Sequence, residues 1–102
     1  MTDNTYRITP RKAQQEIRGI AKWGSITLKS HCWERMDERG FDIQDLEYLL
    51  SYCTVTDPPE YDEEHDDWKY RAKGQVIDGD RAIVITIIVS HRELCCITIM
   101  DE

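Results

Sequence analysis

Hydrophobic runs are short in this sequence, and none is long enough to cross a membrane. The longest apolar stretch, residues 82–89, is interrupted by Thr86, whereas a membrane-spanning helix needs about 20 apolar residues. Residues 1–5 contain no basic segment followed by an apolar one, as a secretory signal would require. We therefore expect a soluble, cytoplasmic protein that has no membrane partner.

Cysteine pairs with the spacing of a metal-binding or redox motif are also missing. The four cysteines stand at positions 32, 53, 95 and 96, so no C-x-x-C spacing marks a zinc ribbon or a thioredoxin-type motif. Without an export signal, we expect four reduced thiols that serve as small core residues. The sequence has no internal repeat or domain linker, and 102 residues bury a single core. We therefore predict one domain over residues 1–102, and we expect no cofactor.

Basic residues are absent from the middle of the chain. Residues 41–67 carry ten acidic side chains and no lysine or arginine, so this segment alone makes the net charge of the chain negative, at −7. Within them, residues 57–67 combine two prolines with crowded like charges, which is typical of an exposed loop. A net negative charge argues against nucleic acid as a partner, although a basic surface can survive elsewhere on the molecule.

The pattern of polar and apolar residues predicts helices first and strands afterwards. We expect helices that begin near Thr9, Ser30 and Asp42, which are good caps, an extended segment over 25–28, and strands over 68–77, 82–89 and 94–100. This order predicts an α+β fold with the helices packed on one side of a small antiparallel sheet. The sheet would consist of a three-strand C-terminal meander and a short N-terminal strand. The strand over 82–89, apolar throughout, should be central, with both faces covered.

Basic side chains alternate with apolar ones in the first long strand. Because side chains alternate across a strand, Lys69, Arg71 and Lys73 share one face. Three like charges at this spacing repel one another, and a polyanion would relieve the repulsion. Alternatively, the strand faces solvent, and Asp66 and Asp67 in the acidic loop balance its cations.

A second basic stripe lies on the middle helix. His31, Arg35 and Arg39, spaced four residues apart, line one margin of its core-facing side. The two arginines repel each other by a few tenths of a kcal/mol unless Glu34 and Glu38 compensate locally. A histidine one turn before an arginine suits a proton donor beside a phosphate clamp, or equally a half-buried packing histidine.

The two stripes together predict a groove for an RNA backbone. RNA cleavage needs no metal, because the 2′-hydroxyl is an internal nucleophile that must be deprotonated while the leaving 5′-oxygen is protonated. His31 can transfer protons, and Arg35 and Arg71 can hold the phosphate bidentately. Tyr70 is a further polar candidate, although the alternation places it on the other face. The hypothesis requires Arg35 and Arg71 to converge on one concavity.

Residues 30–41, SHCWERMDERGF, resemble the S-x-H-(A)-x-x-R-M-x-x-R-G-(I) signature of a RelE-like domain family. The residue between Ser30 and His31 is missing, and Cys32 replaces the usual alanine. The order of elements and residues 65–71 are similar to the MqsR toxins, which belong to the RelE superfamily and cleave messenger RNA. The MqsR toxins pair with an antitoxin that carries a zinc-binding domain.

The resemblance implies a RelE-like fold and an mRNA interferase, the toxin of a type II toxin–antitoxin pair. Its partners would be an RNA substrate and a cognate antitoxin. Carried over by position, the catalytic residues would be His31, Arg35, Lys69 and Arg71. The RNA-binding residues would be Arg39, Lys73 and Tyr70.

Two other interpretations remain open. The first alternative is a non-catalytic RelE-like protein-binding module, whose acidic loop 57–67 meets a basic partner and raises the association rate. Alternatively, Asp62, Glu64, His65 and Asp66, or the cysteines with His31, bind a metal. Zinc and calcium sites need ligands at defined spacings, and the acidic residues around His65 do not follow such a pattern. We therefore expect a solvated charge run and no metal.

Overall fold

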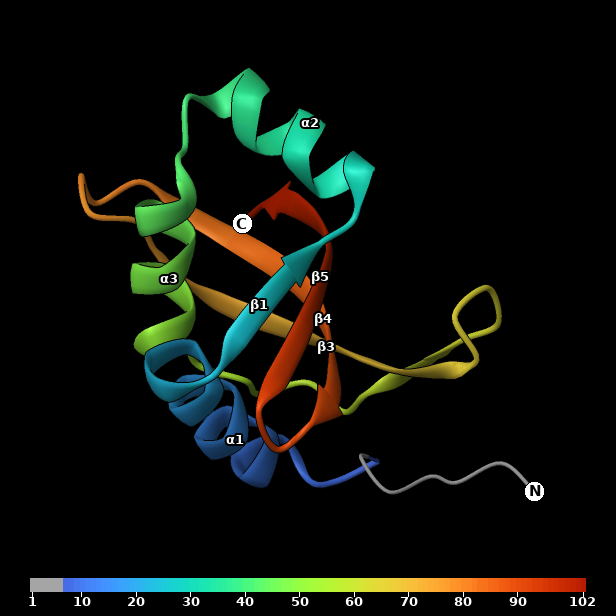
Figure 1. Ribbon diagram of the computed structural model, residues 1–102. Helices are drawn as coiled ribbons and strands as arrows, with labels where there is room; N and C mark the ends of the chain where they lie inside the picture. Colours follow the sequence, from blue (N-terminus) through green and yellow to red (C-terminus); the bar gives the residue numbers. More distant parts are fainter. Residues whose placement is uncertain (1–6) are drawn as a thin grey trace.

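Residues 7–102, the part of the chain that the computed structural model describes, form three helices and one five-stranded sheet (Figure 1). The elements are α1 (Pro10–Trp23), β1 (Ser25–Leu28), α2 (Ser30–Arg39), α3 (Ile43–Ser51), β2 (Glu60–Asp62), β3 (Asp67–Gln75), β4 (Arg81–Ser90) and β5 (Glu93–Asp101). The predicted α+β class is confirmed. No helix in this range is long and apolar enough to span a membrane.

Two helices begin at side-chain caps that the sequence predicted. Thr9 accepts a hydrogen bond from the backbone N–H of Lys12 at 3.2 Å, and Pro10 occupies the first helical position of α1. At α3, the Asp42 carboxylate accepts the N–H of Asp45 at 2.9 Å. The Asp45 carboxylate accepts the N–H of Asp42 in return, at 3.0 Å. These reciprocal bonds satisfy N–H groups that the helix itself leaves unpaired.

The start of α2 differs from the prediction. Its N-cap is Lys29 and not Ser30, and the Lys29 side chain makes no capping hydrogen bond. The Lys29 carbonyl accepts the N–H groups of Cys32 and Trp33 at 2.9 and 3.1 Å. The helix ends at Gly40, whose φ of 72° is the left-handed conformation that glycine adopts without strain. The positive end of the α2 dipole is therefore left without a side-chain cap.

The sheet has the strand order β1-β5-β4-β3-β2, so β4 is central as predicted. It is mixed and not purely antiparallel, because β1 pairs with β5 in parallel. β2 was not predicted, since it lies within the acidic loop 57–67. Tyr61 of β2 stands opposite Trp68 of β3, and their rings meet edge to face at 5.5 Å. This aromatic pair stabilises a strand that the charges alone disfavour.

All three helices contribute to one core on one face of the sheet. The core contains Val84 and Ile88 of β4 together with Ile17 of α1, Met36 of α2 and Leu50 of α3, all buried. In Figure 1, α1 and α3 lie next to each other, and α2 follows β1 at the other end of the sheet. The predicted placement of the helices on one side is therefore confirmed.

The opposite face of β4 is also buried, although its residues do not pack in the core that the helices of the described range cover. Ile83, Ile85 and Ile87 are at most 8% exposed but do not belong to the helix-covered core. They pair directly with Lys73, Arg71 and Lys69 of β3, in that order. The long aliphatic stems of the basic side chains lie beside the isoleucines and shield them from water. We call this the open face of the sheet.

Candidate functional site

A cavity of about 400 Å³ lies between the start of α2, the turn of residues 63–66 and β5. Its lining residues are Lys29, Ser30, His31, Glu64, His65 and Ile97. The volume falls within the range of small-ligand sites, about 300–1,000 Å³. The cavity brings His31, which the sequence predicted as functional, together with His65 from a distant segment.

The path of the backbone explains why the cavity forms here. β1 ends where Leu28 pairs with Cys96, and the N–H of Lys29 donates to the Cys96 carbonyl at 2.9 Å. α2 therefore starts beside the middle of β5. At this point the pairing of β5 with β4 passes from Cys96 to Thr98 and omits Ile97. Such a β-bulge redirects the side chain of the extra residue, and Ile97 lines the cavity.

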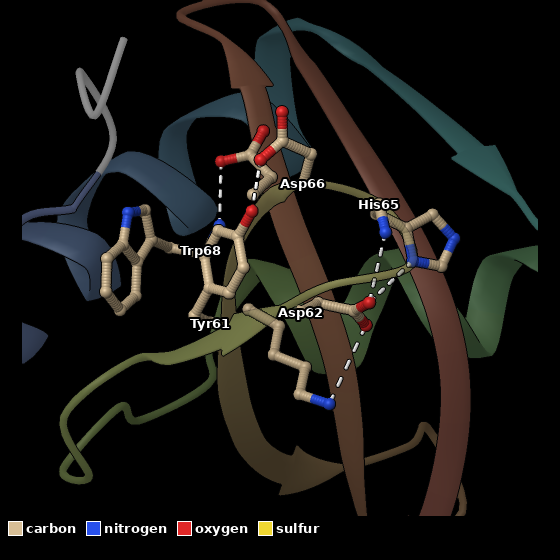
Figure 2. Close-up of polar contacts among 7 residues, drawn as sticks. Tyr61, Asp62, His65, Asp66 and Trp68 are labelled. Carbon is tan, nitrogen blue, oxygen red and sulfur yellow. Dashed lines mark hydrogen bonds and ion pairs between the residues drawn. The ribbon is translucent and has the colours of Figure 1, made fainter. Parts of the chain in front are cut away.

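The 63–66 turn is held by the carboxylate of Asp62. This carboxylate accepts the backbone N–H of His65 at 3.1 Å and lies 3.2 Å from Nδ1 of the same residue (Figure 2). Its second oxygen lies 3.6 Å from Nζ of Lys69. Burial raises the pKa of Asp62. The backbone N–H and the ring of His65, with the charge of Lys69, lower it more, so the net pKa lies below its ordinary value. Asp62 is therefore an ionised anchor at neutral pH.

The opposite side of this hairpin is aromatic. Tyr61 donates its hydroxyl hydrogen to the Asp66 carboxylate, and that bond raises the pKa of the Tyr61 phenol. The guanidinium of Arg7 lies 4.8 Å from the centre of the Trp68 ring. Figure 2 shows Tyr61 and Trp68 on one side of the hairpin and Asp62 with His65 on the other. The aromatic side stabilises the hairpin, and the histidine side faces the cavity.

The same turn gathers metal-ligating atoms. One ligand atom from each of Asp62, Glu64 and His65 lies within 4.8 Å of the other two. Asp66, which the sequence had grouped with them, bonds to Tyr61 instead. Cys32, offered as a ligand beside His31, is buried in the core. Among the described residues near the cavity, the candidate metal ligands are therefore Asp62, Glu64 and His65.

The predicted strand cations lie on the open face, but two of them have acidic partners. Nζ of Lys69 lies 3.6 Å from Asp62, and Nζ of Lys73 lies 3.2 Å from Asp57. Arg71 is half-buried, and its side chain makes no ion pair or hydrogen bond with another described residue. The acidic loop therefore balances this strand as the alternative hypothesis expected, through Asp57 and Asp62 rather than through its last two aspartates.

The predicted helix cations do not reach the cavity. Arg35 is exposed and lies 3.8 Å from Glu38 on the same helix. Arg39 pairs with Asp101 at the end of β5. Neither Arg35 nor Arg71 lines this cavity or either of two others among residues 7–102, one beside Tyr48 and Lys73 and one beside Arg7 and Pro58. The expected convergence of these two arginines is not found, because α2 packs beside β5 and Arg71 projects from β3, two strands away.

The remaining predicted residue, Tyr70, is completely buried. It belongs to the helix-covered core and has no surface for RNA. Sequence reasoning missed Lys29, His65 as a partner of His31, and Asp62 as its anchor. Asp62 and His65 stand three residues apart in a polar turn, and this spacing is the signal from which both could have been predicted.

A family model described as a domain of unknown function, DUF4258, matches residues 28–101. The match covers α2, the 63–66 turn and β5, and it includes every residue that lines the cavity. No curated protein and no solved structure shows a significant match to the chain.

Proposed function

The chain belongs to the DUF4258 family of domains of unknown function, so its activity has to be argued from its own geometry, and we propose that it is a metal-independent endoribonuclease. The observation that carries the proposal is the presence of His31 and His65 in one cavity of about 400 Å³, next to Lys29. Two histidines and a cation are the groups that cleavage by the 2′-hydroxyl requires.

The proposed reaction is a transfer of the phosphate from the 5′-oxygen to the 2′-oxygen. One histidine takes the proton of the 2′-hydroxyl as its oxygen bonds to phosphorus. The bond from phosphorus to the 5′-oxygen breaks, and the second histidine protonates that oxygen. The products are a 2′,3′-cyclic phosphate and a 5′-hydroxyl. Asp62 contacts Nδ1 of His65, which leaves Nε2 of His65 for the substrate.

The cavity also offers binding groups for the phosphate. Lys29 lies at its rim, and the uncapped start of α2 directs backbone N–H groups and the positive end of the helix dipole toward it. From Lys69, beside the cavity wall, the open face continues to Arg71 on the same strand. Lys29 and Arg71, which have no acidic partner among the described residues, supply cations at the two ends of this path for the RNA backbone.

The biological role that we infer is the toxin of a type II toxin–antitoxin pair, acting on messenger RNA in the cytoplasm. The support is the resemblance of residues 30–41 and 65–71 to the RelE-like and MqsR signatures. The partner would be an antitoxin of the kind that carries a zinc-binding domain. The alternative, an acidic docking loop over 57–67, receives less support because Asp57 and Asp62 are already paired within the molecule.

The test is cleavage of a single-stranded RNA oligonucleotide in the presence of EDTA. We expect the protein to release products with a 2′,3′-cyclic phosphate, and His31→Ala and His65→Ala to lower the rate by about 100-fold or more each. His91→Ala is the matched control, because His91 lies in the turn between β4 and β5 and pairs with Glu16. Cleavage that persists in both cavity variants, or that needs a divalent ion, would overturn the proposal.

A further inference from the structure

We propose that the 63–66 turn and the preceding Asp62 form a binding site for a divalent transition-metal ion, with Zn²⁺ as the preferred occupant. The ligands are a carboxylate oxygen of Asp62, a carboxylate oxygen of Glu64 and Nδ1 of His65. Glu64 and His65 also line the cavity that contains His31, so the site is open toward it. Three protein ligands with an open fourth position are the arrangement of zinc sites that also hold a water or a substrate.

The distances fit one ion. Oδ1 of Asp62 and Nδ1 of His65 lie 3.2 Å apart, and the three ligand atoms lie within 4.8 Å of one another. Zinc bonds to nitrogen and oxygen are about 2.0–2.2 Å long, so two ligands at a tetrahedral angle lie about 3.4 Å apart. Asp62 and His65 already have this separation, and only Glu64, at an exposed position, has to move closer.

The buried histidine nitrogen is an independent indication of a ligand. Nδ1 of His65 is shielded from solvent and forms no hydrogen bond within the described part of the chain. Its 3.2 Å contact with Asp62 has the distance of an ion pair, which requires a protonated ring, and leaves Nδ1 without a hydrogen bond. A buried nitrogen without a hydrogen bond normally calls for an explanation. An ion placed off the line between the two atoms satisfies both of them.

The turn is preorganised for this role. The backbone N–H of His65 donates to Asp62 at 3.1 Å, which fixes the carboxylate before any ion arrives. Lys69 contacts the second carboxylate oxygen at 3.6 Å and leaves the first for the ion. Asp62 and His65 have side-chain exposures of only 12% and 20%, so both ligands are held by their surroundings. A second contact that orients a ligand typically raises metal affinity by about 10–100-fold.

The donor set selects among metals. One imidazole nitrogen with two carboxylates suits zinc or another late first-row ion, whereas Mg²⁺ and Ca²⁺ prefer sites built from oxygen alone. The cysteines do not compete for the ion, because a thiol must lose its proton to bind it. Burial raises the pKa of Cys53 to about 12 and, with the nearby Cys95, raises that of Cys32 to about 11.

Occupation of the site would also regulate the chemistry, a consequence that rests on the proposed function. An ion held by Glu64 and His65 would lie in the wall of the cavity that contains His31, where the proposed substrate has to bind. Zinc binding would therefore inhibit RNA cleavage. Metal uptake itself does not depend on the nuclease proposal and is measured separately.

The test is calorimetric titration of the reduced full chain with Zn²⁺, repeated with Mg²⁺, and optical titration with Co²⁺ as a spectroscopic probe. We expect one Zn²⁺ per chain, no measurable binding of Mg²⁺, and cobalt absorption bands typical of a low-coordinate site. His65→Gln and Glu64→Gln should each weaken Zn²⁺ binding by at least about 10-fold. Circular dichroism of the variants shows whether the fold is intact.

His91→Gln is the matched control. Nδ1 of His91 lies 3.2 Å from Glu16, the same separation as between His65 and Asp62, but among residues 7–102 the three-ligand cluster is that of Asp62, Glu64 and His65. We expect this variant to bind Zn²⁺ like the wild type. A wild-type chain that takes up no Zn²⁺, or uptake that His65→Gln leaves unchanged, would overturn the proposal. Loss of RNA cleavage in every sample with normal Zn²⁺ binding would instead overturn only the proposed function.

Discussion

The hydroxyl of Tyr70 makes two hydrogen bonds with a single residue. It accepts the N–H of Ile8 at 2.7 Å and donates to the Ile8 carbonyl at 3.2 Å. Because Tyr70 is completely buried on β3, these bonds attach the segment before α1 to the sheet. Alternation along the strand predicted the side of the sheet on which Tyr70 lies. Its partner, 62 positions away in the sequence, is set by tertiary packing and left no local signal.

Removal of that hydroxyl should destabilise the protein. Tyr70→Phe keeps the ring but leaves the N–H and carbonyl of Ile8 without their partner, which costs about 1–2 kcal/mol. We expect this loss in the free energy of unfolding measured by urea denaturation. Tyr48→Phe is the control, since Tyr48 is 38% exposed, and it should change stability by less than about 0.5 kcal/mol. Equal effects of the two substitutions would contradict a structural role for the buried hydroxyl.

The two histidines of the candidate site differ in how far the sequence predicts them. His31 was predicted because it stands at a fixed position on an amphipathic helix, where spacing alone decides which side it occupies. His65 lies in a turn, and its position depends on the contact with Asp62 and on the pairing of β2 with β3. Spacing within the chain does not reveal that such a turn lies beside the start of α2. The sequence therefore predicted the contribution of His31 to the cavity but not that of His65.

At the scale of elements, local signals predicted the helices better than the strands. Caps and periodicity lie within a few residues of the helix that they define, so α1 and α3 begin where they were expected. The parallel pairing of β1 with β5 joins segments that are far apart in the chain. β2 depends on the contact between Tyr61 and Trp68 across the hairpin. These pairings come from tertiary structure, and the polarity pattern does not contain them.

The difference between the true cap of α3 and the missing cap of α2 can be measured. Asp42→Ala removes an acceptor that bonds the N–H of Asp45 at 2.9 Å, and it should lower the free energy of unfolding by about 1 kcal/mol. Ser30→Ala should change it by only a few tenths of a kcal/mol, because Lys29 and not Ser30 is the N-cap of α2. Thermal or urea unfolding of both variants checks the contrast. A loss of about 1 kcal/mol in Ser30→Ala would restore Ser30 as a cap.

At the scale of the whole molecule, the distribution of charge matters more than its sum. The net charge of −7 argued against RNA, and the acidic segment does neutralise part of the basic strand. It does so selectively, because Asp62 pairs with Lys69 and Asp57 pairs with Lys73. Arg71 lies between the two lysines on the same face and has no acidic partner in the described residues. The fold therefore leaves one strand cation free for an external anion.

This selectivity predicts that Arg71 and Lys73, which carry the same charge on the same face, contribute unequally to RNA binding. Arg71→Ala removes a guanidinium that can bind phosphate directly, so we expect about a 10-fold weaker affinity and a salt dependence smaller by about one unit of slope. Lys73→Ala should change the affinity by less than about 2-fold, because the Lys73 ammonium is already paired with the Asp57 carboxylate, 3.2 Å away. Fluorescence titration with a 2′-methoxy oligonucleotide, which cannot be cleaved, measures binding apart from catalysis. Equal losses in both variants would mean that RNA displaces Asp57 from Lys73, and no loss in either would exclude the open face as the path of the RNA backbone.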